Sequence, residues 1–223
     1  MGTKITIFGP MLQRFFIVIL GFTLLASSCA TKEEETSLKE GDLLFQDLDC
    51  GPMCNAIEAV TEGVNGRDFS HCAMVITEHD SLKVIEAIGS AVQITSLSDF
   101  LKRSNKVLAA RLKTSNNGLV SRAVKYAKTL EGKPYDDVFL MNNGAYYCSE
   151  LLYESFLVAN EGKPIFSLAP MTFKDPETHD FYPVWVDYYH ELHCRIPEGK
   201  PGLNPGSISR STQIEFLDIV LKP

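Results

Sequence analysis

The chain has 223 residues, of which 45% are hydrophobic and 22% charged, and its formal net charge is −7. This length is enough for one domain with a full hydrophobic core, and the composition excludes a fully disordered, collagen-like or coiled-coil chain. The acidic balance, with no basic stripe or aromatic platform in the sequence, argues against a nucleic-acid partner.

Residues 1–28 have the pattern of a secretory signal. A basic start precedes an apolar run over residues 15–26, which is short for a membrane span, and small residues follow it. Cys29 comes next, as in a bacterial lipobox, where the cysteine is acylated and becomes the new N-terminus. The leucine usual three residues before that cysteine is Ala26 here. An ordinary signal peptide with a chance cysteine is the alternative.

Residues 29–40 are polar and contain three consecutive glutamates, so we expect a solvated tether between a lipid and a folded domain over residues 41–223. Two or three acyl chains hold a protein on a membrane far better than one. The expected location is therefore the bacterial cell envelope, with a lipid anchor in the outer membrane. The sequence does not decide whether the protein lies on the periplasmic or the outer face of this membrane.

Short apolar segments in the first half of the domain predict strands with tight turns between them, which favours an antiparallel meander. An amphipathic helix is expected over residues 55–64, and a short helix capped by Ser96 or Ser98 should precede the last of these strands. The predicted strands are residues 43–45, 71–77, 82–87, 91–95 and 107–112.

Two longer segments have the 3.6-residue periodicity of amphipathic helices. The first should begin at Asn117 and stop at Gly132, and the second should begin near Cys148. From Gly162 onward prolines recur, and we expect long packed loops with one or two short strands, such as residues 216–221. The predicted class is α+β, an antiparallel sheet with helices packed on one side.

The chain has six cysteines. With Cys29 assigned to lipid, an odd number remains, so at least one thiol is unpaired in an exported protein. Cys50 and Cys54 could form a local disulfide. Cys148 is the candidate for chemistry, because unpaired N–H groups and the dipole in the first turn of a helix favour a thiolate. The alternative is a buried cysteine that only packs.

A nucleophilic thiol needs a base and a group that orients this base. His71 begins a predicted strand, and Glu86 lies inside a neighbouring apolar strand, where a carboxylate is costly unless it is paired. We therefore expect Glu86 to hold His71, with a glutamate on the solvent face of the strand as the alternative. The segment 190–194 lacks the helical His-Glu-x-x-His spacing of a zinc site, and neither a metal nor a cofactor is predicted.

Five motifs then occur in a characteristic order. They are Gly-Asp-Leu-Leu-Phe at 41–45, Phe-Ser-His-Cys-Ala-Met-Val at 69–75, Val-Ile-Glu-Ala at 84–87, Gly-Lys-Pro-Tyr-Asp at 132–136 and Tyr-Cys-Ser-Glu-Leu at 147–151. Together they resemble the NlpC-type cysteine hydrolases of papain-like fold, and more narrowly the circularly permuted YiiX/YebB-like branch. In that branch the histidine precedes the cysteine, as His71 precedes Cys148 here. The resemblance covers residues 41–159 and implies a central antiparallel sheet or partial barrel.

The resemblance implies that Cys148 is the nucleophile, His71 the general base and Glu86 the residue that orients the histidine. The backbone N–H of Cys148 would form part of an oxyanion hole. Cys72 departs from the family pattern, because relatives often carry a small apolar residue after the histidine.

The resemblance also places Tyr147, Tyr135 and Asp136 along the substrate cleft. We expect Glu150 to be a first-turn charge that suits the helix dipole. The long section over residues 161–223 contains no motif of the family, and covering the cleft and setting its specificity is one interpretation of it.

These features predict an envelope-anchored hydrolase that cleaves an amide bond through a thioester. The substrate would be a peptide, a peptidoglycan fragment or a lipid-like molecule. One alternative is an acyltransferase or lipid hydrolase similar to lecithin:retinol acyltransferase. Another, from a different class, is a non-catalytic envelope lipoprotein that uses the cleft for binding.

Overall fold

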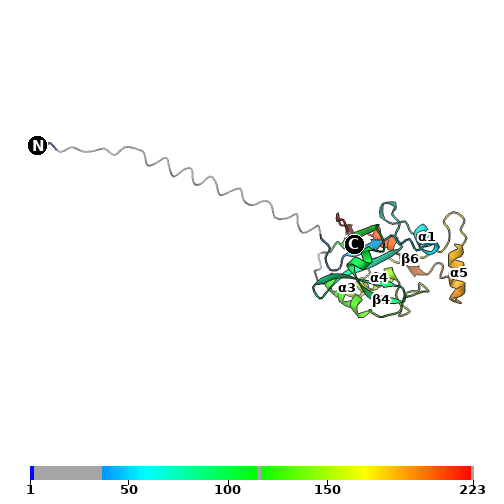
Figure 1. Cartoon of the computed structure of the whole chain (residues 1–223). Helices are drawn as coiled ribbons and strands as arrows, with labels where there is room; N and C mark the ends of the chain where they lie inside the picture. Colours follow the sequence, from blue (N-terminus) through cyan, green and yellow to red (C-terminus); the bar gives the residue numbers. More distant parts are fainter. Residues whose placement is uncertain (3–36, 115–116, 222–223) are drawn as a thin grey trace. The chain divides into compact units, whose positions relative to one another are not determined.

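The computed structural model describes residues 1–2, 37–114 and 117–221 (Figure 1). The predicted signal peptide, the acylation of Cys29 and most of the tether lie outside these residues. Residues 37–40, which we expected in the tether, contact the domain. Arg111 donates a hydrogen bond to the carbonyl of Ser37, and the Glu40 carboxylate accepts one from the N–H of Thr77. In the described part of the chain, no helix has the length and apolar character needed to cross a membrane.

A six-stranded antiparallel sheet with the order β4-β3-β2-β1-β5-β8 forms the centre of the domain. Its strands are β1 (Leu43–Gln46), β2 (His71–Glu78), β3 (Ser81–Ile88), β4 (Ala91–Ser96), β5 (Val107–Leu112) and β8 (Ile214–Phe216). The predicted meander of β2, β3 and β4 is confirmed, and the bounds agree within one residue. Consecutive strands joined by tight turns pair most readily with each other, which explains this agreement.

Alternating side chains give this sheet two apolar faces. One face packs under the two long helices, α3 (Asn117–Thr129) and α4 (Cys148–Ala159), which both begin where the sequence predicted. The other face packs against the short helix α2 (Leu97–Leu101) and against apolar residues after β8. Of the two candidate caps of α2, Ser96 is the one that caps it, because its hydroxyl accepts a hydrogen bond from the N–H of Asp99 at 3.0 Å.

Helix α1 (Pro52–Ala59) differs from the prediction at both ends. It begins three residues before the expected start, because Pro52 already has a helical φ and needs no N–H partner in the first turn. It stops at Ala59, and a 3-10 turn, η1 (Val64–Gly66), follows instead of a last helical turn. The disulfide that the spacing allowed is present between Cys50 and Cys54, and it joins the helix to the turn before it.

The C-terminal section is more regular than its prolines led us to expect. It contains helices α5 (Pro183–Glu191) and α6 (Pro205–Ser209) and a small sheet of β6 (Ala169–Pro170) with β7 (Pro201–Gly202). Both helices begin with a proline in the first turn, so these prolines start helices rather than break them. The predicted strand over residues 216–221 is wrong, since β8 ends at Phe216.

Candidate active site

Cys148 is the first residue of α4, as the sequence predicted. Tyr147 before it has extended backbone angles, so the helix begins abruptly at the thiol. The first N–H groups of a helix have no partner within the helix and carry a partial positive charge. The side chain of Cys148 is nearly buried, since the residue retains 7% of its exposure. The thiol therefore lies in an electropositive setting and is screened from bulk water.

His71 and Glu86 form a buried pair on strands β2 and β3. Nε2 of His71 donates a hydrogen bond to Oε2 of Glu86 over 2.7 Å. Glu86 is 0% exposed, so the alternative of a glutamate on the solvent face of the strand is wrong. A buried carboxylate without partners would cost several kcal/mol, and this pairing gives Glu86 the partner that the sequence required.

Two further residues bind Glu86. Arg103, just after α2, donates from Nη2 to both carboxylate oxygens at 2.7 Å, and the Thr95 hydroxyl donates to Oε1 at 2.6 Å. Burial alone would raise the pKa of Glu86, but the bonds from His71, Thr95 and Arg103 bring its pKa below the usual value. The carboxylate is therefore ionised and held in one orientation. Sequence reasoning named neither Thr95 nor Arg103.

The second ring nitrogen of His71, Nδ1, remains for Cys148, because Nε2 is bound to Glu86. Burial would lower the pKa of His71, yet hydrogen bonds to Cys148 and Glu86 raise this pKa to about 9. For Cys148, a hydrogen bond from the Cys72 side chain lowers the pKa, burial opposes this, and the bond to His71 lowers it further. The net effect holds the pKa of Cys148 well below the usual thiol value. A thiolate–imidazolium pair is the form that these shifts favour at neutral pH.

Cys72 is the residue that departs from the family pattern, and it lies against Cys148. Burial, together with the hydrogen bond and charge of Cys148, raises the pKa of Cys72 well above the usual value. Cys72 thus stays a neutral thiol and acts as a donor to the Cys148 sulfur. The sequence marked the position as unusual without indicating this contact.

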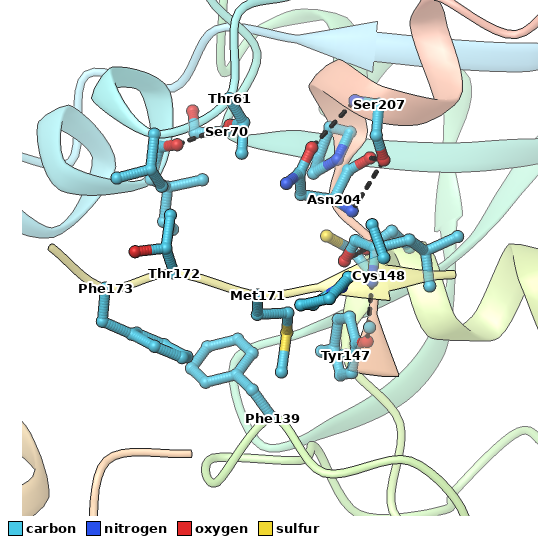
Figure 2. Close-up of a pocket in the computed structure, with 18 of the residues that line it drawn as sticks. Thr61, Ser70, Phe139, Tyr147, Cys148, Met171, Thr172, Phe173, Asn204 and Ser207 are labelled. Atoms are coloured by element: carbon cyan, nitrogen blue, oxygen red, sulfur yellow. Dashed lines mark hydrogen bonds between the residues drawn. The ribbon is translucent and has the colours of Figure 1, made fainter. Parts of the chain in front are cut away.

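Cys148 forms part of the wall of a cavity of about 230 Å³ (Figure 2). One water needs only about 10–15 Å³ of such space, so the cavity has room for an organic group. Tyr147 and Tyr135, which the resemblance placed along a substrate cleft, line this cavity. Asp136 does not line it, because its buried carboxylate accepts hydrogen bonds from nearby N–H groups. Asp136 therefore shapes the loop after Tyr135 rather than contacting a ligand.

Much of the cavity wall comes from the C-terminal section, for which the sequence offered no motif. Residues 169–173 and 202–205 line it together with Ser207 and Arg210. Helix α6 is held in place by a capping box, in which Asn204 and Ser207 bind each other's backbone N–H groups. The interpretation that residues 161–223 cover the cleft agrees with this placement.

Glu150 is not the ionised first-turn charge that we expected. It is 1% exposed, and burial, followed by the charge of Asp136, raises its pKa to about 8. The hydrogen bond that its Oε1 accepts from the N–H of Asn142 is too weak to offset these effects. Desolvation outweighs the favourable helix dipole here, so Glu150 is mostly protonated at neutral pH.

A cysteine at the start of a helix, a histidine on an earlier strand of an antiparallel sheet and a carboxylate behind that histidine define the permuted papain-like class. Residues 37–218 match the family described as "Permuted papain-like amidase enzyme, YaeF/YiiX, C92 family". The chain belongs to this family, whose description is that of cysteine amidase- or peptidase-type hydrolases.

Two similar proteins are both YiiX proteins. The chain is 28% identical to the uncharacterized protein YiiX of Escherichia coli (strain K12) over 119 residues, which is 52% of this chain and 56% of YiiX. The crystal structure of metalloprotein yiiX from Escherichia coli O157:H7 matches with a TM-score of 0.67 at 21% identity, covering 83% of this chain and 98% of that one. This second likeness concerns the fold. The described residues here contain no group of three or more His, Cys, Asp or Glu side chains able to hold a metal, and we assign no step to one.

Proposed function

We propose that the protein is a cysteine amidase in which Cys148 is the nucleophile, His71 the acid and base, and Glu86 the residue that orients His71. The observation that carries this proposal is the buried His71–Glu86 bond of 2.7 Å beside a thiol at a helix N-terminus. Membership of an amidase family supports the same chemistry. The substrate is an amide from a peptide, a peptidoglycan fragment or a lipid-like molecule.

The reaction begins when the Cys148 thiolate attacks the amide carbonyl carbon. The first N–H groups of α4 stabilise the negative charge that forms on the carbonyl oxygen. His71 gives its proton to the leaving nitrogen, the C–N bond breaks, and an amine departs from the thioester. Water then attacks the thioester while His71 accepts a proton. The carboxylic acid leaves, and the thiolate–imidazolium pair is restored.

Glu86 stabilises the imidazolium and keeps its ring oriented through Nε2, which leaves Nδ1 toward the sulfur. Arg103 and Thr95 hold Glu86 in turn. Cys72 donates a hydrogen bond to the thiolate before attack and thus adds to the fall in the pKa of Cys148. A hydrogen bond that stabilises the thiolate also lowers its nucleophilicity. Cys72 therefore raises the fraction of Cys148 that is ionised and lowers the reactivity of each thiolate.

We also propose that the chain is exported and anchored to the bacterial envelope through a lipid on Cys29. The sequence of residues 1–29 carries this part of the proposal. The Cys50–Cys54 disulfide supports it, because disulfides persist in oxidising compartments. Mass spectrometry of the mature N-terminus should find an acylated cysteine in the membrane fraction, and Cys29→Ser should release the protein. An N-terminus cleaved elsewhere and without lipid would overturn the anchor alone.

The amidase proposal is tested by trapping the thioester. The protein is mixed briefly with peptide, peptidoglycan-fragment and acyl-amide substrates, quenched in acid and digested for mass spectrometry. An acyl adduct should appear on the peptide that contains Cys148 and be lost in Cys148→Ala. Cys194→Ser, which removes an exposed free thiol, is the matched control and should retain the adduct. Hydrolysis that persists in Cys148→Ala would overturn the proposal.

A further inference from the structure

The cavity beside Cys148 has two chemically different sides. Figure 2 shows Phe139, Tyr147, Met171 and Phe173 on one side and Thr61, Ser70, Asn204 and Ser207 on the other. We propose that this cavity selects amides that join an apolar group to a group bearing a carboxylate, with Arg210 and Asn204 binding the carboxylate. This inference rests on the proposed amidase function and names the substrate class of the same site.

The apolar side is a rigid wall of aromatic rings. The Phe139 ring lies 5.5 Å from that of Tyr147 and 5.9 Å from that of Trp185, and Trp185 lies 5.1 Å from Phe173. The two contacts of Trp185 are edge-to-face, and such contacts fix the rings in place without a ligand. A preformed apolar surface favours a hydrocarbon side chain or acyl chain by about 25 cal/mol per Å² of apolar area removed from water. A wholly polar substrate would leave this wall without a partner.

The hydroxyl groups on the other side already have partners. Thr61 donates to the carbonyl of Ile57, and Ser207 donates to that of Asn204. Ser70 accepts from the N–H of Leu48 and donates to the carbonyl of the same residue. These side chains are therefore engaged within the protein, and recognition on this side depends on its other polar groups.

Asn204 supplies one of these groups. Its Oδ1 accepts a hydrogen bond from the backbone N–H of Ser207 at 2.8 Å, which settles which end of the amide is the oxygen. The dashed lines between Asn204 and Ser207 in Figure 2 mark this cap. The Nδ2 group is therefore the end turned away from the cap of α6, and it is a donor. A donor at this edge of the cavity suits an oxygen ligand.

Arg210 supplies the other group, directly after α6. Of the described residues that line the cavity, it is the one with a positively charged side chain, and the Cys148 thiolate is the one anion. The ion pairs between described residues do not include it. The chain as a whole is acidic, with a formal net charge of −7, so a cationic side chain at this cavity is not a consequence of composition. Asn204 and Arg210 flank α6 and both line the cavity, so an amide N–H and a guanidinium are available to the two oxygens of one carboxylate.

Two kinds of molecule share this chemistry. One is an acyl chain joined to the nitrogen of an amino acid, and the other is a short peptide with an apolar residue before its C-terminus. Both place an amide between a hydrophobic group and a carboxylate. The experiment therefore uses a probe pair for each kind: N-octanoylglycine against N-octanoylglycinamide, and leucylglycine against leucylglycinamide. Within each pair, only the carboxylate is changed to a neutral amide.

We expect the wild-type protein to show a kcat/KM about 10-fold or more higher for the carboxylate member of at least one pair, and the pair that shows it identifies the kind of substrate. Arg210→Gln should bring the ratio of the two kcat/KM values close to one. Lys163→Gln is the control, because it removes the same charge at an exposed position beyond the far end of α4, and it should keep the wild-type ratio. An unchanged ratio in Arg210→Gln, or a wild-type preference for the neutral members, would overturn the inference.

A binding measurement separates this inference from the amidase proposal. Cys148→Ala is titrated by calorimetry with both members of each pair, and the same titrations are made with a variant that also carries Arg210→Gln. Tighter binding of the carboxylate member that depends on Arg210 supports the recognition even when no probe is hydrolysed. Hydrolysis of all four probes at equal rates, with equal affinities, would support the amidase proposal and contradict the proposed carboxylate site.

Discussion

His71 and Glu86 lie on neighbouring strands, and a hydrogen bond of 2.7 Å joins Nε2 of the histidine to Oε2 of the glutamate. This bond has a consequence beyond stability, because it commits one ring nitrogen and leaves the other for the sulfur of Cys148. Glu86 is itself fixed by Arg103 and Thr95, so the orientation of the imidazole is set by residues that do not contact the thiol. The geometry of the proposed site is thus built on the sheet and completed by the helix.

Glu86→Gln should lower kcat/KM by about 100-fold or more, because a neutral amide no longer stabilises the imidazolium and can favour the wrong tautomer. The pH profile should shift as well, since the pKa of His71 loses one of the bonds that raise it. Steady-state kinetics between pH 5 and 10 check both effects. Glu78→Gln is the control, since Glu78 ends β2 in the same sheet and forms a partly exposed ion pair with Lys83. Equal activity in both variants would count against the role of Glu86.

Arg103→Gln should destabilise the fold by about 2–4 kcal/mol, because the buried Glu86 carboxylate loses a charged partner. Urea unfolding at neutral pH measures the change. The neighbouring Lys102 forms an exposed pair with Asp99, and exposed pairs contribute only about 0–1 kcal/mol. Lys102→Gln should therefore leave the unfolding free energy almost unchanged. Equal losses in the two variants would show that Arg103 does not neutralise a buried charge.

Alkylation by iodoacetamide should be fast at Cys148 in mildly acidic solution, because its pKa lies well below the usual thiol value. The exposed Cys194 serves as the internal reference. Identical pH dependence at the two thiols would mean that Cys148 is not activated.

The rate of hydrolysis should fall above about pH 9, where His71 loses the proton that the leaving nitrogen needs.

Glu150→Gln should change how stability depends on pH. The pKa of Glu150 is raised from 4.5 to about 8, so the folded protein binds this proton more tightly than the unfolded chain does. The contribution of Glu150 to stability is therefore full below about pH 4.5 and is lost as the pH rises through about 8. Relative to wild type, Glu150→Gln should gain roughly 4 kcal/mol between pH 5 and 9. Parallel stability curves for the two proteins would show that Glu150 is ionised in the fold.

Most of the sheet and the start of α4 could be predicted from the sequence, because both depend on local periodicity and on short turns. The pairing of Glu86 with His71 was also predictable, since a carboxylate in an apolar strand requires a partner. Arg103 could have been suggested as a second partner from its place after the short helix that Ser96 begins. Its contact with Glu86 depends on how α2 packs on the sheet, and the periodicity of the sequence does not indicate that packing.

Other features depend on distant packing. Pro183 and Pro205 were interpreted as breakers, although a proline in the first helical turn costs nothing. Glu150 was assigned a charge from its place near the helix N-terminus, but the loop that holds Asp136 covers it and keeps it protonated. Much of the cavity wall is formed by residues 169–173 and 202–210. Nothing in the sequence of these residues indicates that they pack beside Cys148. The wall reaches the thiol because β6 pairs with β7 and Gly206 of α6 packs closely against the backbone of residues 61–62, after α1.

The cavity combines parts of separate origin. Strands β2 and β3 and helix α4 carry the groups that we propose react, whereas the small β6–β7 sheet and helix α6 form the opposing wall. An engineer could therefore exchange the C-terminal wall for that of a relative and redirect the choice of molecule while leaving the thiol and its imidazole untouched. On the proposed function, the fold separates the groups that break a bond from the surface that selects the substrate.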